Sequence, residues 1–119
     1  MADIRHAPAG VIAELERGIK WHESGLSGDG LTPETVAWAR RLVRGDRISI
    51  DKAVKMRAWL ARHRVDKQGE GFSPGERGYP SPGRVAWALW GGDPAVTWSD
   101  RVVRADQRAD RAASGANNG

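Results

Sequence analysis

A hydroxyl or carboxylate side chain followed directly by proline stands before an apolar, periodic segment at Thr32-Pro33, Ser81-Pro82 and Asp93-Pro94. The short polar side chain can accept a hydrogen bond from a free N–H of the first helical turn. Proline suits the first helical position because no donor is lost there. Each dipeptide therefore predicts the start of a helix, and Ser49 followed by Asp51 predicts another.

Apolar residues recur at three- and four-residue steps around these starts, which is typical of amphipathic helices. A first helix fits residues 8–24. A second begins at Pro33, ends at Gly45 and carries an apolar stripe of Val36, Ala39, Leu42 and Val43. A third, capped by Ser49, has Ile50, Val54, Ala58 and Ala61 on one face, widened by Met56, Trp59, Leu60 and His63. The short linker at 45–48 predicts that the second and third helices form a compact hairpin.

The rest of the chain divides into a loop, two helices and a tail. Residues 66–80 contain four Gly and two Pro without periodicity, which predicts a long loop pinned by Phe72 and Tyr79. Helices follow from Pro82 to Gly91 and from Asp93 onward. We expect an all-α orthogonal bundle of four to five short helices with one long Gly/Pro-rich loop, a single domain at 1–112 and a disordered tail at 113–119.

Composition narrows the class of protein further. The 119 residues are 39% hydrophobic and 29% charged, as in one globular domain. The absence of cysteine excludes disulfides and thiolate metal sites. No apolar run is long enough to span a membrane, and residues 1–5 lack the pattern of a signal peptide. We therefore expect no membrane association.

Six Trp but only one Phe and one Tyr supply the large aromatic side chains. An indole buries a large area but needs a partner for its N–H, so it suits the edge of a core or an interface. Core packing is expected for Trp38, Trp59 and Trp87, and either place for Trp21, Trp90 and Trp98. A surface for a protein partner would then comprise Phe72, Tyr79, Trp90 and Trp98.

Positive charge is concentrated in the middle of the chain. Residues 38–67 contain ten Lys or Arg against three Asp, a net charge of +7, whereas the whole chain carries +4 and the remainder therefore −3. A basic helical segment is typical of proteins that contact phosphate backbones. The predicted nucleic-acid contacts are Arg40, Arg41, Arg44, Arg47, Lys52, Lys55 and Arg62. Alternatively, these cations are solvated faces of amphipathic helices or pair with acidic residues of the first helix.

No set of residues predicts catalysis. His6, His22 and His63 lie far apart and match no metal-ligand spacing. The pairs His22 with Glu23 and His63 with Asp66 lack an accompanying nucleophile motif. The Gly-rich stretches at 25–30 and 69–78 lack the features of a phosphate-binding loop. We therefore expect no metal, no cofactor and no enzymatic activity.

Residues 30–90 also carry a resemblance, in the strings GDGLTPETV, KMRAWLARHRVDKQGEGFSPGE and YPSPGRVAWALWGGD. They resemble a small helical domain that recurs in tailed-bacteriophage proteins, including head-morphogenesis, prohead protease and capsid-associated gene products. The resemblance extends over residues 18–98, about two thirds of the chain, and brings no catalytic residues with it. It implies a phage or prophage setting, in the bacterial host cytoplasm or the virion, close to capsid protein or packaged DNA.

These observations together predict a non-enzymatic phage accessory module that binds nucleic acid through its basic helices. The alternative is a virion structural protein, either a capsid decoration or a head-assembly component. Such a protein would bind a phage capsid protein through the Trp and loop aromatics.

Overall fold

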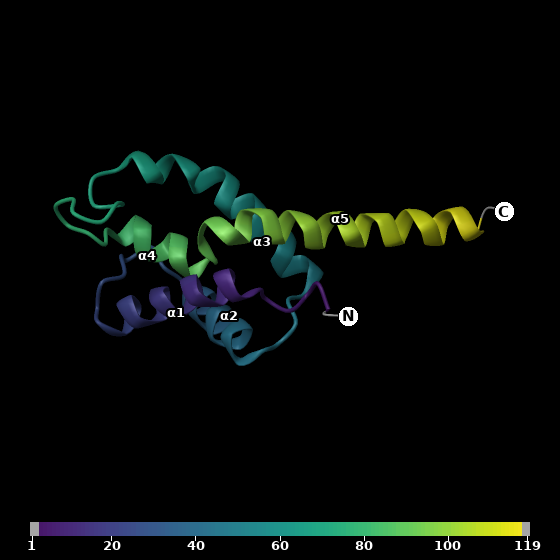
Figure 1. The fold of residues 1–119 in the computed structure, drawn as a ribbon, viewed down its shortest axis with the longest axis horizontal. Coiled ribbons are helices and arrows are strands. Elements are labelled where there is room, and N and C mark those ends of the chain that lie inside the picture. Colours follow the sequence, from purple (N-terminus) through teal and green to yellow (C-terminus); the bar gives the residue numbers. More distant parts are fainter. Residues whose placement is uncertain (1–2, 118–119) are drawn as a thin grey trace.

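The structure, a computed structural model, describes residues 3–117. It contains α1 (Ala9–Glu23), α2 (Pro33–Arg44), α3 (Ile50–His63), a 3-10 helix η1 (Arg64–Gln68), α4 (Pro82–Leu89) and α5 (Gly92–Asn117). No strand occurs within the described residues. The predicted all-α class is therefore confirmed (Figure 1).

Three of the predicted helix starts form as expected. The hydroxyls of Thr32, Ser49 and Ser81 each accept a hydrogen bond from the backbone N–H three residues later. The fourth differs, because α5 begins at Gly92 and Asp93 lies in its first turn. The Asp93 carboxylate accepts instead from Trp87 Nε1 at 2.9 Å and lies 2.7 Å from Lys67 Nζ.

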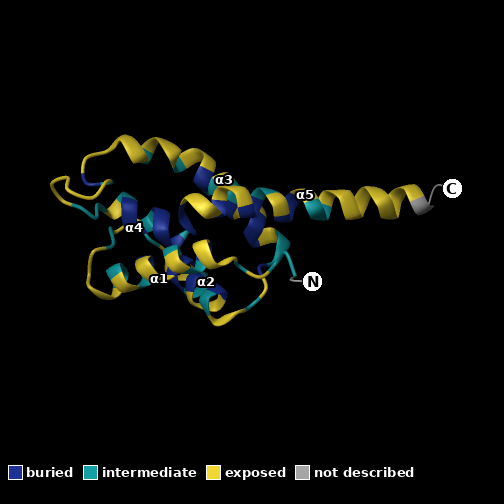
Figure 2. Cartoon of the chain, viewed as in Figure 1, coloured by how far each residue is buried: buried dark blue, intermediate teal, exposed yellow. Residues whose placement is uncertain are grey.

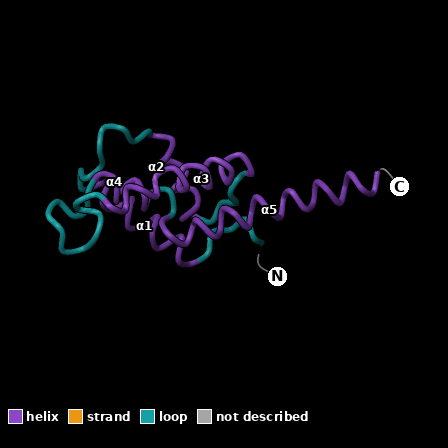
Figure 3. The backbone as a smooth tube through the Cα atoms, turned by 90° about the horizontal axis from the view of Figure 1, so that it is seen from above, coloured by secondary structure: helices purple, strands orange, loops and turns teal. Residues whose placement is uncertain are grey.

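The helices pack as two groups around one core. α1 packs against α4 and α2, whereas α3 packs mainly against α5, which it crosses (Figures 1 and 3). The predicted compact hairpin of α2 and α3 is therefore wrong. The linker at 45–49 is held by the N-terminal segment instead, since Ile48 N–H donates to Arg5 O and Arg5 Nε donates to Ile48 O.

The core is made of aliphatic side chains and two indoles. Its buried members include Val11, Leu15, Leu42, Ile48, Met56, Leu60, Trp87 and Trp98. The predicted buried face of α3 is right for Met56 and Leu60, which are buried, and wrong for Val54, Ala58 and Ala61, which are exposed; Ala53 is buried in addition. The buried face of α3 thus holds its larger apolar side chains, Met56 and Leu60, while Val54 is left 43% exposed.

Two features tie α1 closely to α4. A Cβ on Gly18 would lie 2.9 Å from both the backbone nitrogen and the Cγ of Leu89, so only glycine permits this approach. Nearby, Arg84 Nη2 donates to Glu14 Oε1 at 3.1 Å and Arg84 Nη1 lies 3.0 Å from Glu14 Oε2. Both side chains are largely buried, and the Arg84 guanidinium also lies over the rings of Trp21 and Phe72.

The predicted loop is partly structured. Its first residues belong to η1, and the remainder consists of turns. Phe72 packs edge-on against Trp87 and Tyr79 packs edge-on against Trp21. The prediction that these two aromatic residues pin the loop is confirmed.

The last helix is longer than the short helices that were predicted. α5 runs from Gly92 to Asn117, disorder of 113–119 stays a prediction, and residues 118–119 lie outside the described residues. Alanines of high helix propensity and ion pairs one turn apart, such as Arg104 with Asp100 at 2.8 Å, support this helix. Its buried residues end at Val103, and the part beyond projects from the globule into solvent (Figure 2).

Candidate functional site

Three of the seven predicted nucleic-acid contacts form ion pairs elsewhere in the molecule. Arg40 Nη1 lies 3.4 Å from Glu23 Oε1 on α1, and Arg44 pairs with Asp46 at 2.8 Å. Arg47 pairs with Asp3 near the N-terminus. All three guanidinium groups are at least half exposed. Exposed pairs of this kind contribute little free energy, so these cations can exchange partners.

Of the other four, one lies on α2 and three lie on α3. Arg41 on α2 is exposed and its guanidinium lies 5.1 Å from the centre of the Trp38 ring. Lys55 and Arg62 on α3 are exposed. Lys52 differs from the prediction of an exposed contact, because it is only 6% exposed.

Lys52 is held between two indoles that come from different helices. Its Nζ lies 3.6 Å from the ring centre of Trp90 and 6.0 Å from that of Trp38. Within the described residues, no carboxylate lies within 4.0 Å of this nitrogen. Burial lowers the pKa of Lys52 to about 8, with Glu34 opposing the change and Lys55 and Arg41 adding to it. Arg41, Lys52 and Lys55 are thus close enough to influence one another.

The indole of Trp90 also belongs to a stack of three rings. Trp90 and Trp59 are parallel at 5.1 Å between ring centres, and Trp59 and His63 are parallel at 4.1 Å. His63 Nδ1 is in turn 3.0 Å from Asp66 Oδ2. We call Trp38, Lys52, Trp90, Trp59 and His63 the aromatic ladder, which joins α2, α3 and the end of α4.

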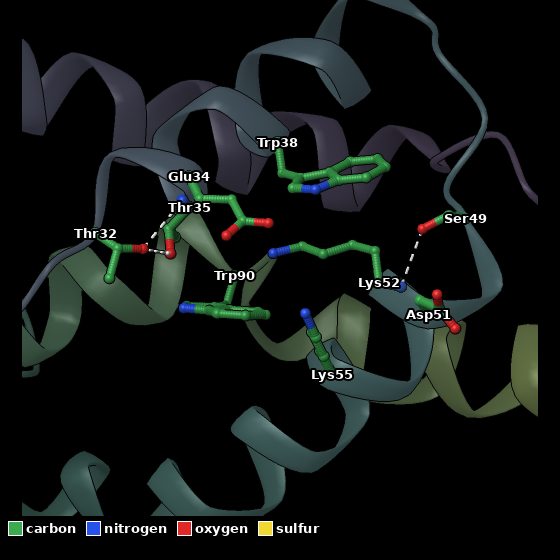
Figure 4. Close-up of a pocket in the computed structure, with 9 residues that line it drawn as sticks. All are labelled: Thr32, Glu34, Thr35, Trp38, Ser49, Asp51, Lys52, Lys55 and Trp90. Carbon is green, nitrogen blue, oxygen red and sulfur yellow. Dashed lines mark hydrogen bonds between the residues drawn. The ribbon is translucent and has the colours of Figure 1, made fainter.

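A pocket of about 290 Å³ opens between Trp38 and Trp90, around the Lys52 side chain (Figure 4). We call it the lysine pocket. Lys52 extends into it between Trp38 and Trp90, with Lys55 at the Trp90 side and Glu34 opposite (Figure 4). Its lining residues are Thr32, Glu34, Thr35, Trp38, Ser49, Asp51, Lys52, Lys55 and Trp90.

A second cavity of about 450 Å³ lies at the other end of the ladder. We call it the apolar cavity, because its walls are mainly Leu31, Pro82, Val85, Ala86 and the indoles of Trp59 and Trp90. Polar side chains at its wall are Ser27, Thr32, Thr35, His63 and Asp66. It shares Thr32, Thr35 and Trp90 with the lysine pocket, so the two cavities are adjacent.

The four residues predicted to bind a protein partner make contacts within the fold. Trp98 is 3% exposed and its Nε1 donates to Ile4 O at 2.8 Å, so it does not reach the surface. Phe72 and Tyr79 are half-buried against Trp87 and Trp21. Trp90 is half-buried, with one face on Lys52 and the other on Trp59. These contacts give the capsid-binding alternative no support.

Two further observations concern the described residues as a whole. Among residues 3–117, no three His, Asp or Glu side chains are grouped so that they could hold a metal ion. No helix in that range combines the length and the apolar character that crossing a membrane requires.

The fold and the site define a small all-helical module with an indole-lined surface pocket that holds two lysines and two carboxylates. No protein-family model, curated protein or solved structure matches the chain.

Sequence reasoning identified the cations of the site but missed its aromatic ladder. Lys52, Lys55, Trp59 and His63 lie at intervals of three and four residues, so they share one stripe of α3. That spacing was visible in the sequence. The contribution of Trp38 and Trp90 was not, because it depends on how α2 and α4 pack beside α3.

Proposed function

We propose that this protein is a non-enzymatic module that binds nucleic acid through the surface around the lysine pocket. The observation that carries the proposal is the convergence of Arg41, Lys52 and Lys55 beside Trp38 and Trp90. Lysine and arginine neutralise backbone phosphates and release counterions. Indoles next to such cations offer apolar surface to the sugars and bases of the same strand.

The cations around the pocket outnumber its carboxylates by one, since Arg41, Lys52 and Lys55 stand against Glu34 and Asp51. Glu34 attracts the buried Lys52 ammonium without lying within 4.0 Å of it, so a phosphate at the mouth of the pocket would add to the counter-charge that Glu34 supplies. Exposed Arg40 and Arg44 lie on the same helix as Arg41, and their surface ion pairs can exchange for phosphate contacts.

As the biological context we propose a phage or prophage, a setting that rests on the sequence resemblance alone. The module would then work close to packaged DNA or to the capsid that contains it. A module that coats or anchors nucleic acid there needs affinity for the backbone and no catalytic centre.

Fluorescence anisotropy with labelled 20-nucleotide oligonucleotides, both single-stranded and duplex, tests the proposal. We expect the native protein to bind at least one of them in low salt. The double variant Arg41→Gln/Lys55→Gln should bind roughly tenfold more weakly or worse, because losing about 1.4 kcal/mol raises the Kd tenfold.

The matched control is Arg108→Gln/Arg111→Gln, which removes the same charge from the exposed end of α5. We expect it to keep most of the native affinity. The proposal would be overturned if the native protein bound neither oligonucleotide, or if both double variants lost the same amount of affinity. The oligonucleotides should also remain intact during incubation, because cleavage would contradict a non-enzymatic role.

A further inference from the structure

The apolar cavity adjoins the lysine pocket across a single indole. Trp90 lines both, and so do Thr32 and Thr35. On the lysine side the lining offers the ammonium groups of Lys52 and Lys55 and the carboxylates of Glu34 and Asp51, with the Arg41 guanidinium over Trp38. On the other side it offers aliphatic carbons and indole edges. The pair of cavities therefore suits a ligand that joins a flat, largely apolar body to an anionic group.

From this arrangement we propose that the module binds single-stranded nucleic acid, with one unstacked base in the apolar cavity and the adjoining phosphate at Lys52 and Lys55. The inference rests on the proposed function and names the form of nucleic acid that the site takes. A nucleotide is the unit of such a strand, and it combines a planar ring with a phosphate.

The lining of the apolar cavity matches a base in shape and chemistry. Leu31, Pro82 and Ala86 provide walls for a ring, and a volume of about 450 Å³ accommodates it with part of its sugar. Asp66 and Ser27 place hydrogen-bonding groups at the wall. Asp66 also accepts from His63 at 3.0 Å, which orients its carboxylate. An N–H on the pairing edge of a base, such as N3–H of thymine, can donate to that oxygen.

Both faces of Trp90 are already covered, by Lys52 and by Trp59. The base would therefore meet the edges of the indoles instead of stacking on the face of Trp90. Because the rings are fixed in the ladder, the cavity wall is preformed and binding needs little ordering of the protein.

A duplex cannot use this cavity without losing base pairing. In a double helix the bases are stacked and paired, and removing one into a pocket costs free energy that a single strand does not spend. We therefore expect preference for a single strand over a duplex of equal length and charge.

The first experiment compares three fluorescent 12-nucleotide probes with the native protein: oligo(dT), its duplex with oligo(dA), and an abasic strand that keeps every phosphate. We expect the abasic strand and the duplex to bind about tenfold more weakly than oligo(dT), because base contacts are absent or inaccessible. Equal affinity for oligo(dT) and the abasic strand, or tighter binding of the duplex, would overturn the inference.

The second experiment fills the cavity without changing charge. Ala86→Leu on α4 places a larger side chain at the cavity wall, and Ala58→Leu adds the same atoms at an exposed position of α3. We expect Ala86→Leu to lose about tenfold in oligo(dT) affinity, while its affinity for the abasic strand and that of Ala58→Leu for oligo(dT) stay native. Unchanged oligo(dT) binding by a folded Ala86→Leu would contradict the base site.

The outcomes separate this inference from the proposed function. If no probe binds in low salt, the proposed function itself fails. If all three bind with similar, salt-sensitive affinity, nucleic-acid binding stands and the base site is rejected. Because the abasic comparison uses the native protein, it decides the question even if Ala86→Leu does not fold.

Discussion

Lys52 affects both the stability of the fold and the proposed binding of nucleic acid. Its ammonium is buried against Trp90, and burial lowers the pKa of Lys52 to about 8 from 10.5. The unfolded chain therefore holds this proton more tightly than the folded protein. Residues that lower the free energy of unfolding and are nevertheless kept in a pocket are typical of binding sites.

The pH dependence follows with a definite sign. Between pH 8 and pH 10.5 the unfolded state retains a proton that the folded state has released, so the free energy of unfolding rises with pH across this window. We expect a contribution of about 3 kcal/mol from Lys52 over the whole window. Urea unfolding at pH 7 and pH 10 measures it against Lys52→Met, which removes the charge and keeps a long side chain between the indoles.

At pH 7 Lys52→Met should be more stable than the native protein, and the difference should shrink toward pH 10. The same variant should bind oligonucleotides more weakly. A variant that is less stable at pH 7 by an amount independent of pH would show that the attraction between the ammonium and the indoles outweighs desolvation.

The buried pair of Glu14 and Arg84 has the opposite character, because each charge neutralises the other, and the half-exposed Arg17 also pairs with Glu14. Glu14→Gln would leave the Arg84 guanidinium in a largely buried place without a full counter-charge. We expect a loss of about 3 kcal/mol in the free energy of unfolding. The matched control is Glu70→Gln, whose partner Arg77 is 92% exposed, and thermal unfolding of the control should be native. A native melting midpoint for Glu14→Gln would contradict this assignment.

At the scale of the elements, the close contact between α1 and α4 depends on one glycine. Alanine normally favours a helix over glycine by about 1 kcal/mol. We expect Gly18→Ala to lower stability nevertheless, because its Cβ would lie 2.9 Å from the Leu89 backbone nitrogen. Gly115→Ala is the control, since nothing lies within 4 Å of that position, and it should leave the melting midpoint native or higher. A stabilised Gly18→Ala would show that the helices can separate freely.

Features that depend on residues close in the sequence could be predicted, whereas features that depend on contacts between helices could not. Helix starts at Thr32, Ser49 and Ser81 were predictable, because a cap involves only residues three apart. The buried face of α3 was not, because burial of Lys52 and exposure of Val54 depend on neighbours that periodicity does not reveal. The separate packing of α2 and α3 likewise reflects contacts with α1 and α5.

The candidate site shows the same division. Lys55 and Arg41 could be predicted as contacts from the local excess of positive charge. The aromatic ladder could not be predicted, because Trp38, Trp90 and Trp59 come together from separate helices. The six tryptophans indicated unusual aromatic packing but did not indicate which of them would be in contact.

At the scale of the whole molecule, the globule and the projecting end of α5 are energetically distinct. The principal extents are 60, 28 and 24 Å, and the described side chains from 107 to 115 are exposed. We expect a chain ending at residue 107 to keep the native melting midpoint within about 2 °C, because the removed residues bury little apolar area. Oligonucleotide affinity should also be native. A large loss of either would show that the projecting helix belongs to the core or to the binding site.

The slope of the logarithm of oligo(dT) affinity against the logarithm of salt concentration tests the central claim most directly. For the native protein we predict a steep negative slope, and for Arg41→Gln/Lys55→Gln a slope shallower by about 1.5, because two phosphate contacts are lost. Identical slopes for the two proteins, or a native affinity that does not change with salt, would contradict the account.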